Sequence, residues 1–444
     1  MSPLGIILWI GLLVLAGFGV LRGLGAQLAK LPSSTDRRVI AVVLGALTLA
    51  GLALRLWVAG TTHRLLDAPA ALIGDEGRYD SIARDLLNGQ FFPWPASTPV
   101  YPLFLAACYA VFGRSYAAAL IAQAFVSATA VPLTYRLARR FIEPWSALAA
   151  SLLTAVHPGL ITQVDMLYTE AIYTPLWIAT ALSLCRLLED PGLRRSLAAG
   201  AWLAASTLCR PMTALLPLVM PLVMPHRWRM AQRVRIVAVL MGVLAVATAP
   251  WAYHNWRTQR AFLPFGFSLT MLWHGSPEFY HIMAKKPNAM LRVWDDELNP
   301  ERNGGHDPMT IEGDRYFTAR AKASIRAEPG VYAWYSLQKL AFFWIGHPAA
   351  EYDWPFNAWA TAWQRLKYFG ARLLTVCLAL LGLFILRRRL RTFALLLLIC
   401  GYFMAVHAVL VPVARYSEPL YPILAVFIAA AAGEVARRRT GELP

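Results

Sequence analysis

The sequence has little charge: charged residues make up 15% of its 444 residues, whereas soluble domains carry about 25%. Hydrophobic residues make up 58%, and apolar runs near the roughly 20 residues needed to cross a bilayer recur along the chain. A soluble protein of this length would instead show short amphipathic elements with a polar face. The shortage of charge therefore excludes a large soluble core and indicates a polytopic all-α membrane protein.

Cysteine is also scarce. The five cysteines are scattered singly, mostly inside apolar runs, and no pair has the spacing of metal ligands. We therefore expect buried thiols, without a disulfide or a cysteine metal site. The sequence also lacks a Walker loop, a dinucleotide fingerprint and a nucleophile elbow, which argues against nucleoside triphosphate, dinucleotide and serine hydrolase chemistry.

The net charge of +17 would suit nucleic-acid binding, but the position of the charges argues against it. Half of the 42 lysines and arginines lie in short clusters between apolar runs: 22–38, 136–140, 186–195, 227–235, 387–391 and 437–439. Such clusters are typical of cytoplasmic loops. The basicity thus reports membrane topology, and we expect no nucleic-acid partner.

Alternating basic ends predict eleven spans, with the N-terminus outside and the C-terminus inside. The predicted spans are 4–22, 38–59, 116–135, 144–158, 170–186, 196–209, 211–225, 236–252, 366–386, 393–411 and 418–435. Residues 1–435 would form one transmembrane domain, followed by a basic tail over 436–444. Two long segments, 60–115 and 253–365, fall outside. Within the first, residues 99–113 are too short for a span, so we expect a helix on or in the outer leaflet.

Two adjacent carboxylates, Asp75 and Glu76, stand just beyond the second span, where an amphipathic helix begins. A carboxylate there can act as a base or hold a cation, and Arg78 on the next turn can hold a phosphate. The alternative interpretation is an acidic first turn that complements the helix dipole.

A second acidic site precedes the span at 170–186, where Glu170 enters an apolar helix. Glu170 is a candidate catalytic carboxylate or a helix cap. Arg210, at the tip of a helical hairpin, and Arg415-Tyr416, before the last span, could hold an anionic headgroup or pair with carboxylates. Both alternatives remain open on the sequence.

A metal site is weakly indicated. Its candidate ligands are Glu76, Asp165 and His274, and a divalent cation is the only cofactor that the sequence suggests. The acidic run at 295–308 lacks the spacing of a calcium loop, and we interpret it as a solvated loop.

Several motifs together carry a resemblance. The sequence is similar to the membrane glycosyltransferases of the GT-C superfamily, specifically the family 39 group of protein mannosyltransferases and lipid A aminoarabinose transferases. The motifs occur in the family's order: DEGRYDSIARDLLNG, TPVYPLFLA, HPGLITQVDMLYTEAIY, AASTLCRPMTALLPL, APWAYHNWRTQRAFLPF and ARYSEPLYPIL. They extend from about residue 40 to 435. Thr98-Pro99-Val100 departs from the Lys-Pro-Pro stretch of the aminoarabinose transferases.

The resemblance implies a helical bundle with membrane-apposed helices in its first external loop. It also implies transfer of a sugar, with inversion, from a polyprenyl-phosphate-linked donor to a lipid, glycan or protein at the periplasmic face of a bacterial inner membrane. Asp75 would be the catalytic carboxylate, with Glu76 beside it and Glu170 as the second acidic position. Arg78 and Tyr79 would contact the donor phosphate or order the loop, and Arg210, Arg415 and Tyr416 would lie at the lipid phosphate.

Other functions are compatible with the same composition. A flippase or transporter of lipid-linked sugars would place charged or Gly/Pro-broken segments in paired halves, near the midplane. Here the carboxylates gather at one face, which favours an enzyme. An O-antigen polymerase or ligase would also use polyprenyl-linked donors, but the placement of the DEGRY motif favours transfer of a single sugar.

Overall fold

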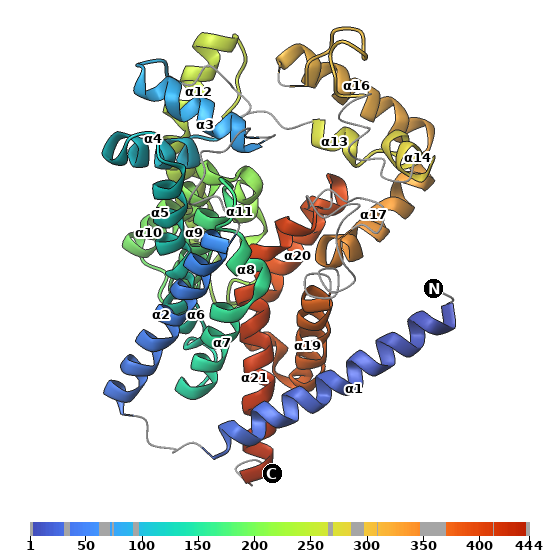
Figure 1. Ribbon diagram of the computed structural model, residues 1–444. Helices are drawn as coiled ribbons and strands as arrows, with labels where there is room; N and C mark the ends of the chain where they lie inside the picture. Colours follow the sequence, from blue (N-terminus) through green and yellow to red (C-terminus); the bar gives the residue numbers. More distant parts are fainter. Residues whose placement is uncertain are drawn as a thin grey trace.

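The structure is a computed structural model of the chain, shown in Figure 1. It describes residues 3–30, 36–61, 72, 75–91, 97–264, 270–285, 297–308, 310–346, 370–411 and 413–440. Every regular element within these ranges is a helix. The predicted all-α transmembrane bundle is therefore confirmed.

Within the described ranges, six helical stretches are long and apolar enough to cross a membrane: Arg37–Gly60, Tyr116–Ala138, Glu170–Glu189, Met230–Gln259, Arg387–Val409 and Ala414–Arg439. Shorter apolar helices cover Val100–Phe112, Pro144–Val156, Pro211–Leu222 and Ala371–Ile385. The protein is thus a multi-pass membrane protein, and the count of eleven spans stays a prediction.

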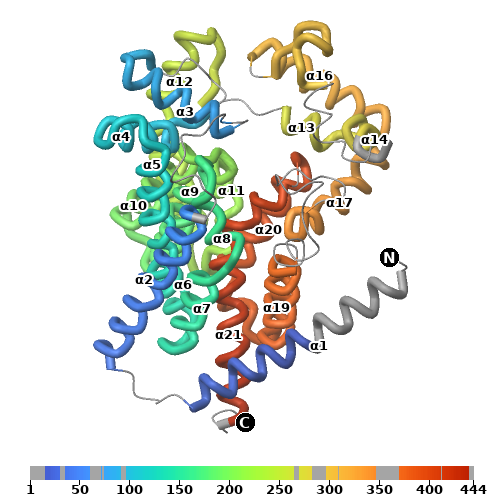
Figure 2. Tube along the Cα trace, in the orientation of Figure 1, coloured from blue at the N-terminus to red at the C-terminus, as the bar shows by residue number. Residues whose placement is uncertain are grey.

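Helices α9 (Glu170–Glu189) and α21 (Tyr421–Thr440) form the centre of the bundle, because both are buried along most of their length. Figure 2 shows α21 between α19 (Ala371–Ile385) and helices of the first half of the chain. The surrounding helices are α1 (Pro3–Leu28), α2 (Arg37–Thr61), α5 (Tyr116–Ala128), α6 (Ala130–Ala138), α7 (Pro144–Val156), α8 (Pro158–Thr162), α10 (Leu193–Cys209), α12 (Met230–Gln259) and α20 (Ala394–Val409).

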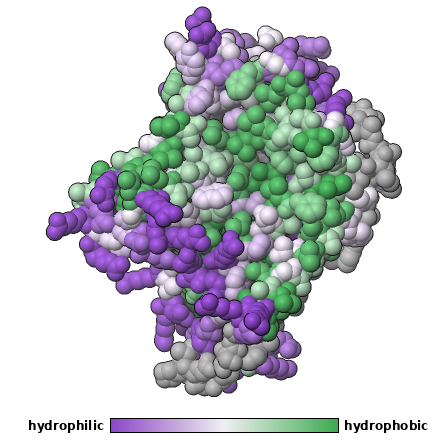
Figure 3. Space-filling model, turned by 90° about the vertical axis from the view of Figure 1, so that its left-hand side faces the viewer, coloured by the Kyte–Doolittle hydropathy of each residue, from purple (hydrophilic) through white to green (hydrophobic). Residues whose placement is uncertain are grey.

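The outer faces of these helices are apolar. On α2, Val42, Leu49 and Trp57 are mostly exposed, although burial of such side chains away from water is favourable. Figure 3 shows a hydrophobic belt between hydrophilic residues at the top and in the lower part of the molecule. A lipid bilayer around this belt would cover the exposed apolar surface, and helices satisfy their own backbone groups within it.

A layer of short helices covers the upper end of the bundle in Figure 1. It consists of α3 (Asp75–Leu87), α4 (Val100–Phe112), α13 (Thr270–His274), α14 (Pro277–Lys285), α16 (Ile311–Ala327) and α17 (Pro329–Ile345). Helices α3 and α4 pack against each other and lie across the end of α5. The orientation of α4 agrees with the prediction that residues 99–113 do not form a span.

The predicted helix at 211–225 is wrong as one continuous element. The structure divides it into the 3-10 turn η1 (Pro211–Thr213), the short helix α11 (Leu216–Val219) and the 3-10 turn η2 (Met220–Leu222). Pro211, Pro217 and Pro221 cause the division, because proline has no backbone N–H to donate within a helix.

The predicted helix at 116–135 is also two helices, α5 and α6, with Thr129 between them. Pro132 cannot bond to the carbonyl four residues earlier, and the helix is interrupted at that point.

Candidate active site

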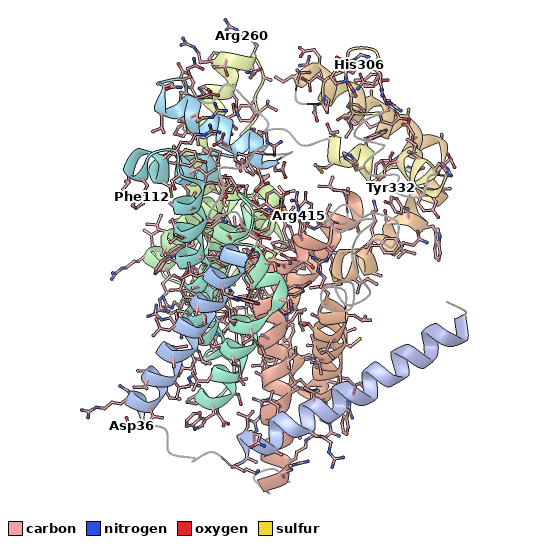
Figure 4. All side chains as sticks on the ribbon, viewed as in Figure 1. Asp36, Phe112, Arg260, His306, Tyr332 and Arg415 are labelled. Atoms are coloured by element: carbon pink, nitrogen blue, oxygen red, sulfur yellow. The ribbon has the colours of Figure 1, made fainter. Side chains whose placement is uncertain are left out.

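The candidate site lies where the ends of four helical segments meet beneath the upper layer. Asp75 begins α3, Glu170 begins α9, and Arg210 follows the last residue of α10. Arg415 and Tyr416 belong to the 3-10 segment η6 (Ala414–Leu420), which leads into α21. Figure 4 shows Arg415 in the interior, below Arg260 and His306 and well above Asp36. Residues that are hundreds of positions apart in the sequence therefore share one site.

Asp75 is held by two arginines. Arg78 Nη2 donates to its Oδ1 at 2.6 Å, and Arg415 Nη2 donates to its Oδ2 at 3.0 Å. Burial alone would raise the pKa of Asp75, but Arg78 and Arg415 outweigh this effect and hold the pKa below its usual value. Asp75 is consequently a carboxylate at neutral pH, as a base or an anionic ligand must be.

Glu170 occupies a deeper position and is almost fully buried. Its Oε1 forms an ion pair with Arg210 and lies 3.6 Å from Arg415 Nε. Thr169 donates its hydroxyl to Oε2 at 3.0 Å. Arg415 thus lies between the two acidic positions and contacts both Asp75 and Glu170.

The arginines of the site face aromatic rings. The guanidinium of Arg210 lies 4.5 Å from the centroid of the Tyr416 ring, and that of Arg415 lies 4.6 Å from the Tyr168 ring. Flat guanidinium groups stack on such faces and present their donors at the edge. Three arginines meet two carboxylates here, so positive charge is in excess and suits a bound phosphate.

Tyr79 belongs to the wall of the site. Its ring contacts the guanidinium of Arg78 at 5.3 Å and packs edge-on against Tyr101. Burial raises the pKa of Tyr79, so its hydroxyl keeps its proton. The position of Tyr79 fits the predicted ordering of the first external loop.

Glu76 does not join this group of arginines. It is buried on another face of α3, where it accepts hydrogen bonds from the Tyr116 hydroxyl at 2.6 Å and from the Leu167 N–H at 2.9 Å. Adjacent residues of a helix are about 100° apart around its axis, so Asp75 and Glu76 face different surroundings. Glu76 ties α3 to α5 and to the segment before α9.

The three weak metal candidates, Glu76, Asp165 and His274, are not gathered as ligands. Among the described residues, no three His, Cys, Asp or Glu side chains lie close enough to hold one metal ion. His274 is instead buried against Trp273 and Phe279, and burial lowers its pKa to about 4. The residues present do not fit a metal site of this composition.

A buried polar cluster that the sequence analysis missed supports η6. Glu418 accepts hydrogen bonds from Arg372 at 2.8 Å and from Gln163 at 3.1 Å. Gln163 in turn accepts one from Thr174 at 3.1 Å. These contacts fix the segment that carries Arg415. The available signal was a charged residue within an apolar helix, which demands a partner.

Lys339 of α17 is a second missed residue. It is fully buried, and its Nζ donates to the carbonyls of Gly275 at 3.0 Å, Leu410 at 3.1 Å and Val409 at 3.4 Å. Burial lowers its pKa to about 7. Lys339 thereby joins the upper layer to the end of α20, five residues before Arg415.

The sequence pattern of the dolichyl-phosphate-mannose-protein mannosyltransferase family matches residues 96–254. A search of curated proteins found no match. The matched range contains Glu170 and Arg210 but neither Asp75 nor Arg415.

Solved structures of an Archaeoglobus fulgidus oligosaccharyltransferase are similar to this chain. The apo form has a TM-score of 0.55 at 14% identity, covering 90% of this chain and 51% of that one. The AglB complex with an inhibitory peptide and a dolichol-phosphate has a TM-score of 0.54 at 13% identity, covering 88% and 50%. The chain thus spans about half the length of these archaeal enzymes. ArnT from Cupriavidus metallidurans, bound to undecaprenyl phosphate, has a TM-score of 0.42 at 15% identity, covering 92% and 79%.

The structural likeness concerns the fold, and the family pattern concerns the sequence of the first half of the bundle. Both agree with the resemblance that the motifs predicted. The chain therefore resembles this mannosyltransferase family in sequence over residues 96–254 and the archaeal oligosaccharyltransferase in fold.

Proposed function

We propose that the protein transfers a sugar from a polyprenyl-phosphate-linked donor to an acceptor hydroxyl or amine at the periplasmic face of a bacterial inner membrane. The observation that carries the proposal is the contact of Asp75 with Arg78 and Arg415, beside the Glu170–Arg210 pair. Under this proposal, Asp75 is the base and the neighbouring arginines are the cations that bind the donor phosphate at one end of the bundle. A solved structure of the archaeal oligosaccharyltransferase, which is similar in fold, is a complex with a dolichol-phosphate, which supports a lipid phosphate as the carrier.

The reaction is one in-line displacement. Asp75 accepts the proton of the acceptor as its oxygen or nitrogen attacks the anomeric carbon. The bond between that carbon and the phosphate oxygen breaks, and the electron pair stays with the lipid phosphate. Arg210 and Arg415 stabilise the charge that develops there. Attack opposite the leaving group inverts the anomeric centre.

The charge distribution supports the outer face as the site of reaction. Arg415 lies at the upper end of the bundle, whereas Asp36 and the basic segment Arg387–Arg391 lie at the other end. Basic loops are retained in the cytoplasm, so the donor would be used after it has reached the periplasmic leaflet. The acceptor is a lipid, a glycan or a protein of the cell envelope.

The test compares the wild type with Asp75→Asn. Purified proteins would be incubated with undecaprenyl-phosphate-linked sugars and a membrane-lipid extract, and transfer would be followed by mass spectrometry. We expect Asp75→Asn to lower the rate roughly 10²- to 10⁴-fold, the usual contribution of a general base. Asp85→Asn is the matched control, because Asp85 lies ten residues further along α3 and has the same charge.

Equal transfer by the wild type and a folded Asp75→Asn variant would remove Asp75 from the mechanism. If the wild type transfers no sugar but moves lipid-linked sugar across vesicle membranes, the protein is a transporter and the proposal is wrong. Thermal melting of both proteins would establish that the variant is folded.

A further inference from the structure

The contacts of Asp75 conflict with its proposed role, which the following inference takes as given. A general base needs a carboxylate oxygen that is open to the proton it accepts. Here Arg78 holds Oδ1 and Arg415 holds Oδ2. Each oxygen therefore already accepts a hydrogen bond from a cation, and the two arginines lower the affinity of the carboxylate for the acceptor's proton.

The two arginines differ in how far they can leave Asp75. Arg78 lies three residues along the same helix and moves with Asp75. Arg415 comes from η6, a separate segment, and also lies near Glu170. The Asp75 and Arg415 side chains are 31% and 21% exposed, whereas Glu170 is 5% exposed. Because the Arg78 side chain is 23% exposed, an entering ligand can reach both contacts of Asp75, and Arg415 is the partner that can leave it.

Arg210 can act on the phosphate only while it remains paired with Glu170. It pairs with the buried Glu170 and donates to the Thr169 hydroxyl at 3.2 Å. Separation of such a buried pair leaves an uncompensated charge, which is strongly unfavourable. Of the arginines in the site, Arg415 is therefore the one that a phosphate can recruit at the lowest cost in free energy.

We propose that Arg415 is exchanged between Asp75 and the phosphate of the lipid-linked donor, so that donor binding frees Asp75 Oδ2 for the acceptor. In the absence of donor, Arg415 donates to Oδ2 of Asp75 and keeps this carboxylate from acting as a base. When the donor phosphate is bound, Arg415 turns to it, and Oδ2 is open to the acceptor proton. After transfer, the lipid phosphate departs and Arg415 returns to Asp75.

This exchange fixes the order of the steps, because the donor must bind before Asp75 can accept a proton. Water or an acceptor that arrives before the donor finds the carboxylate occupied, and the donor is activated only when Arg415 neutralises its phosphate. Asp75 and the phosphate also compete for one guanidinium, so Asp75 opposes binding of the lipid phosphate. That competition can be measured without any sugar transfer.

The experiment is a double-mutant cycle on the binding of undecaprenyl phosphate. Wild type, Asp75→Asn, Arg415→Gln and the double variant would be purified in detergent, and dissociation constants would be measured by titration with native mass spectrometry. We expect Asp75→Asn to bind about tenfold more tightly than the wild type, since the phosphate no longer displaces a charge-assisted hydrogen bond. In the Arg415→Gln background, Asp75→Asn is expected to change binding less than about twofold.

Asp85→Asn controls for the loss of a negative charge from α3, and we expect it to leave binding unchanged. Unchanged or weaker binding by Asp75→Asn would overturn the exchange. A gain that persists in Arg415→Gln would also overturn it, because the gain would then arise from net charge alone.

Sugar transfer by the wild type, measured on the same preparations, separates the two proposals. Transfer without the binding pattern would reject the exchange and leave the proposed function standing. The binding pattern without transfer would support competition between Asp75 and the lipid phosphate for Arg415, and it would reject the proposed function.

Discussion

At the scale of single residues, the Glu170–Arg210 pair is set apart by its burial. Glu170 is 5% exposed and Arg210 is 11% exposed, so neither charge is well solvated. A buried ion pair contributes little net stability compared with apolar residues, but removal of one partner leaves the other charge buried alone. The pair is therefore expected to respond sharply to a change in either member.

We predict that Glu170→Gln destabilises the protein by about 3 to 5 kcal/mol and lowers its melting temperature in detergent. Glu189→Gln is the matched control at the other end of α9, where Glu189 forms an exposed pair with Arg140 at 2.8 Å. An exposed pair contributes about 0 to 1 kcal/mol. Equal melting temperatures for the two variants would show that Glu170 and Arg210 do not depend on each other for stability.

The residues of the site were largely predictable by type, but their contacts were not. Acidic and basic residues at the ends of apolar helices stood out because charge is rare in such a sequence. Whether Arg415 would pair with a carboxylate or remain free for a headgroup depended on a contact across 340 positions. Similarly, the choice between Asp75 and Glu76 depended on how α3 rotates as it packs on α5.

At the scale of elements, the long helices could be predicted from hydropathy and from the basic loops, since the thickness of a bilayer sets the length of a helix that spans it. The division of the two proline-containing helices could not be predicted in this way. Proline in a hydrophobic run lowers the hydropathy only slightly, although it removes a hydrogen-bond donor. The arrangement of α13 to α17 was also beyond the sequence analysis. The contacts of these helices include those of Lys339, which donates to backbone carbonyls. A backbone carbonyl can belong to any residue type, so such contacts leave no pattern in the sequence.

The burial of Lys339 leads to a prediction about how the stability of the protein depends on pH. The pKa of this lysine is lowered by burial to about 7, from 10.5, so the unfolded chain binds more protons than the folded protein between these values. Stability therefore rises with pH across that window. We expect Lys339→Met to lose this rise, measured as the melting temperature at pH 7 and pH 9.5. Lys322→Met, at an exposed position of α16, should keep it, and an unchanged slope in Lys339→Met would contradict the assignment.

At the scale of the whole molecule, the two hydrophilic ends are expected to lie in different compartments. The predicted orientation places Glu301 in the periplasm and Arg388 in the cytoplasm, and both residues are exposed. In cells, a membrane-impermeant maleimide should label Glu301→Cys directly and Arg388→Cys only after lysis. Four of the five native cysteines are buried and the fifth is half-buried, so background labelling should be low. The reverse pattern would invert the proposed topology.

The distance in sequence between Asp75 and Arg415 also has a consequence for biosynthesis. The two residues are 340 positions apart, so α3 and α9 are synthesised long before η6 exists. Until then, Asp75 has Arg78 but lacks the cation that links it to Glu170. A nascent chain therefore lacks the Asp75–Arg415 contact until η6 has been synthesised. Premature termination before η6 would leave a bundle without Arg415 in its site and without α21 at its centre.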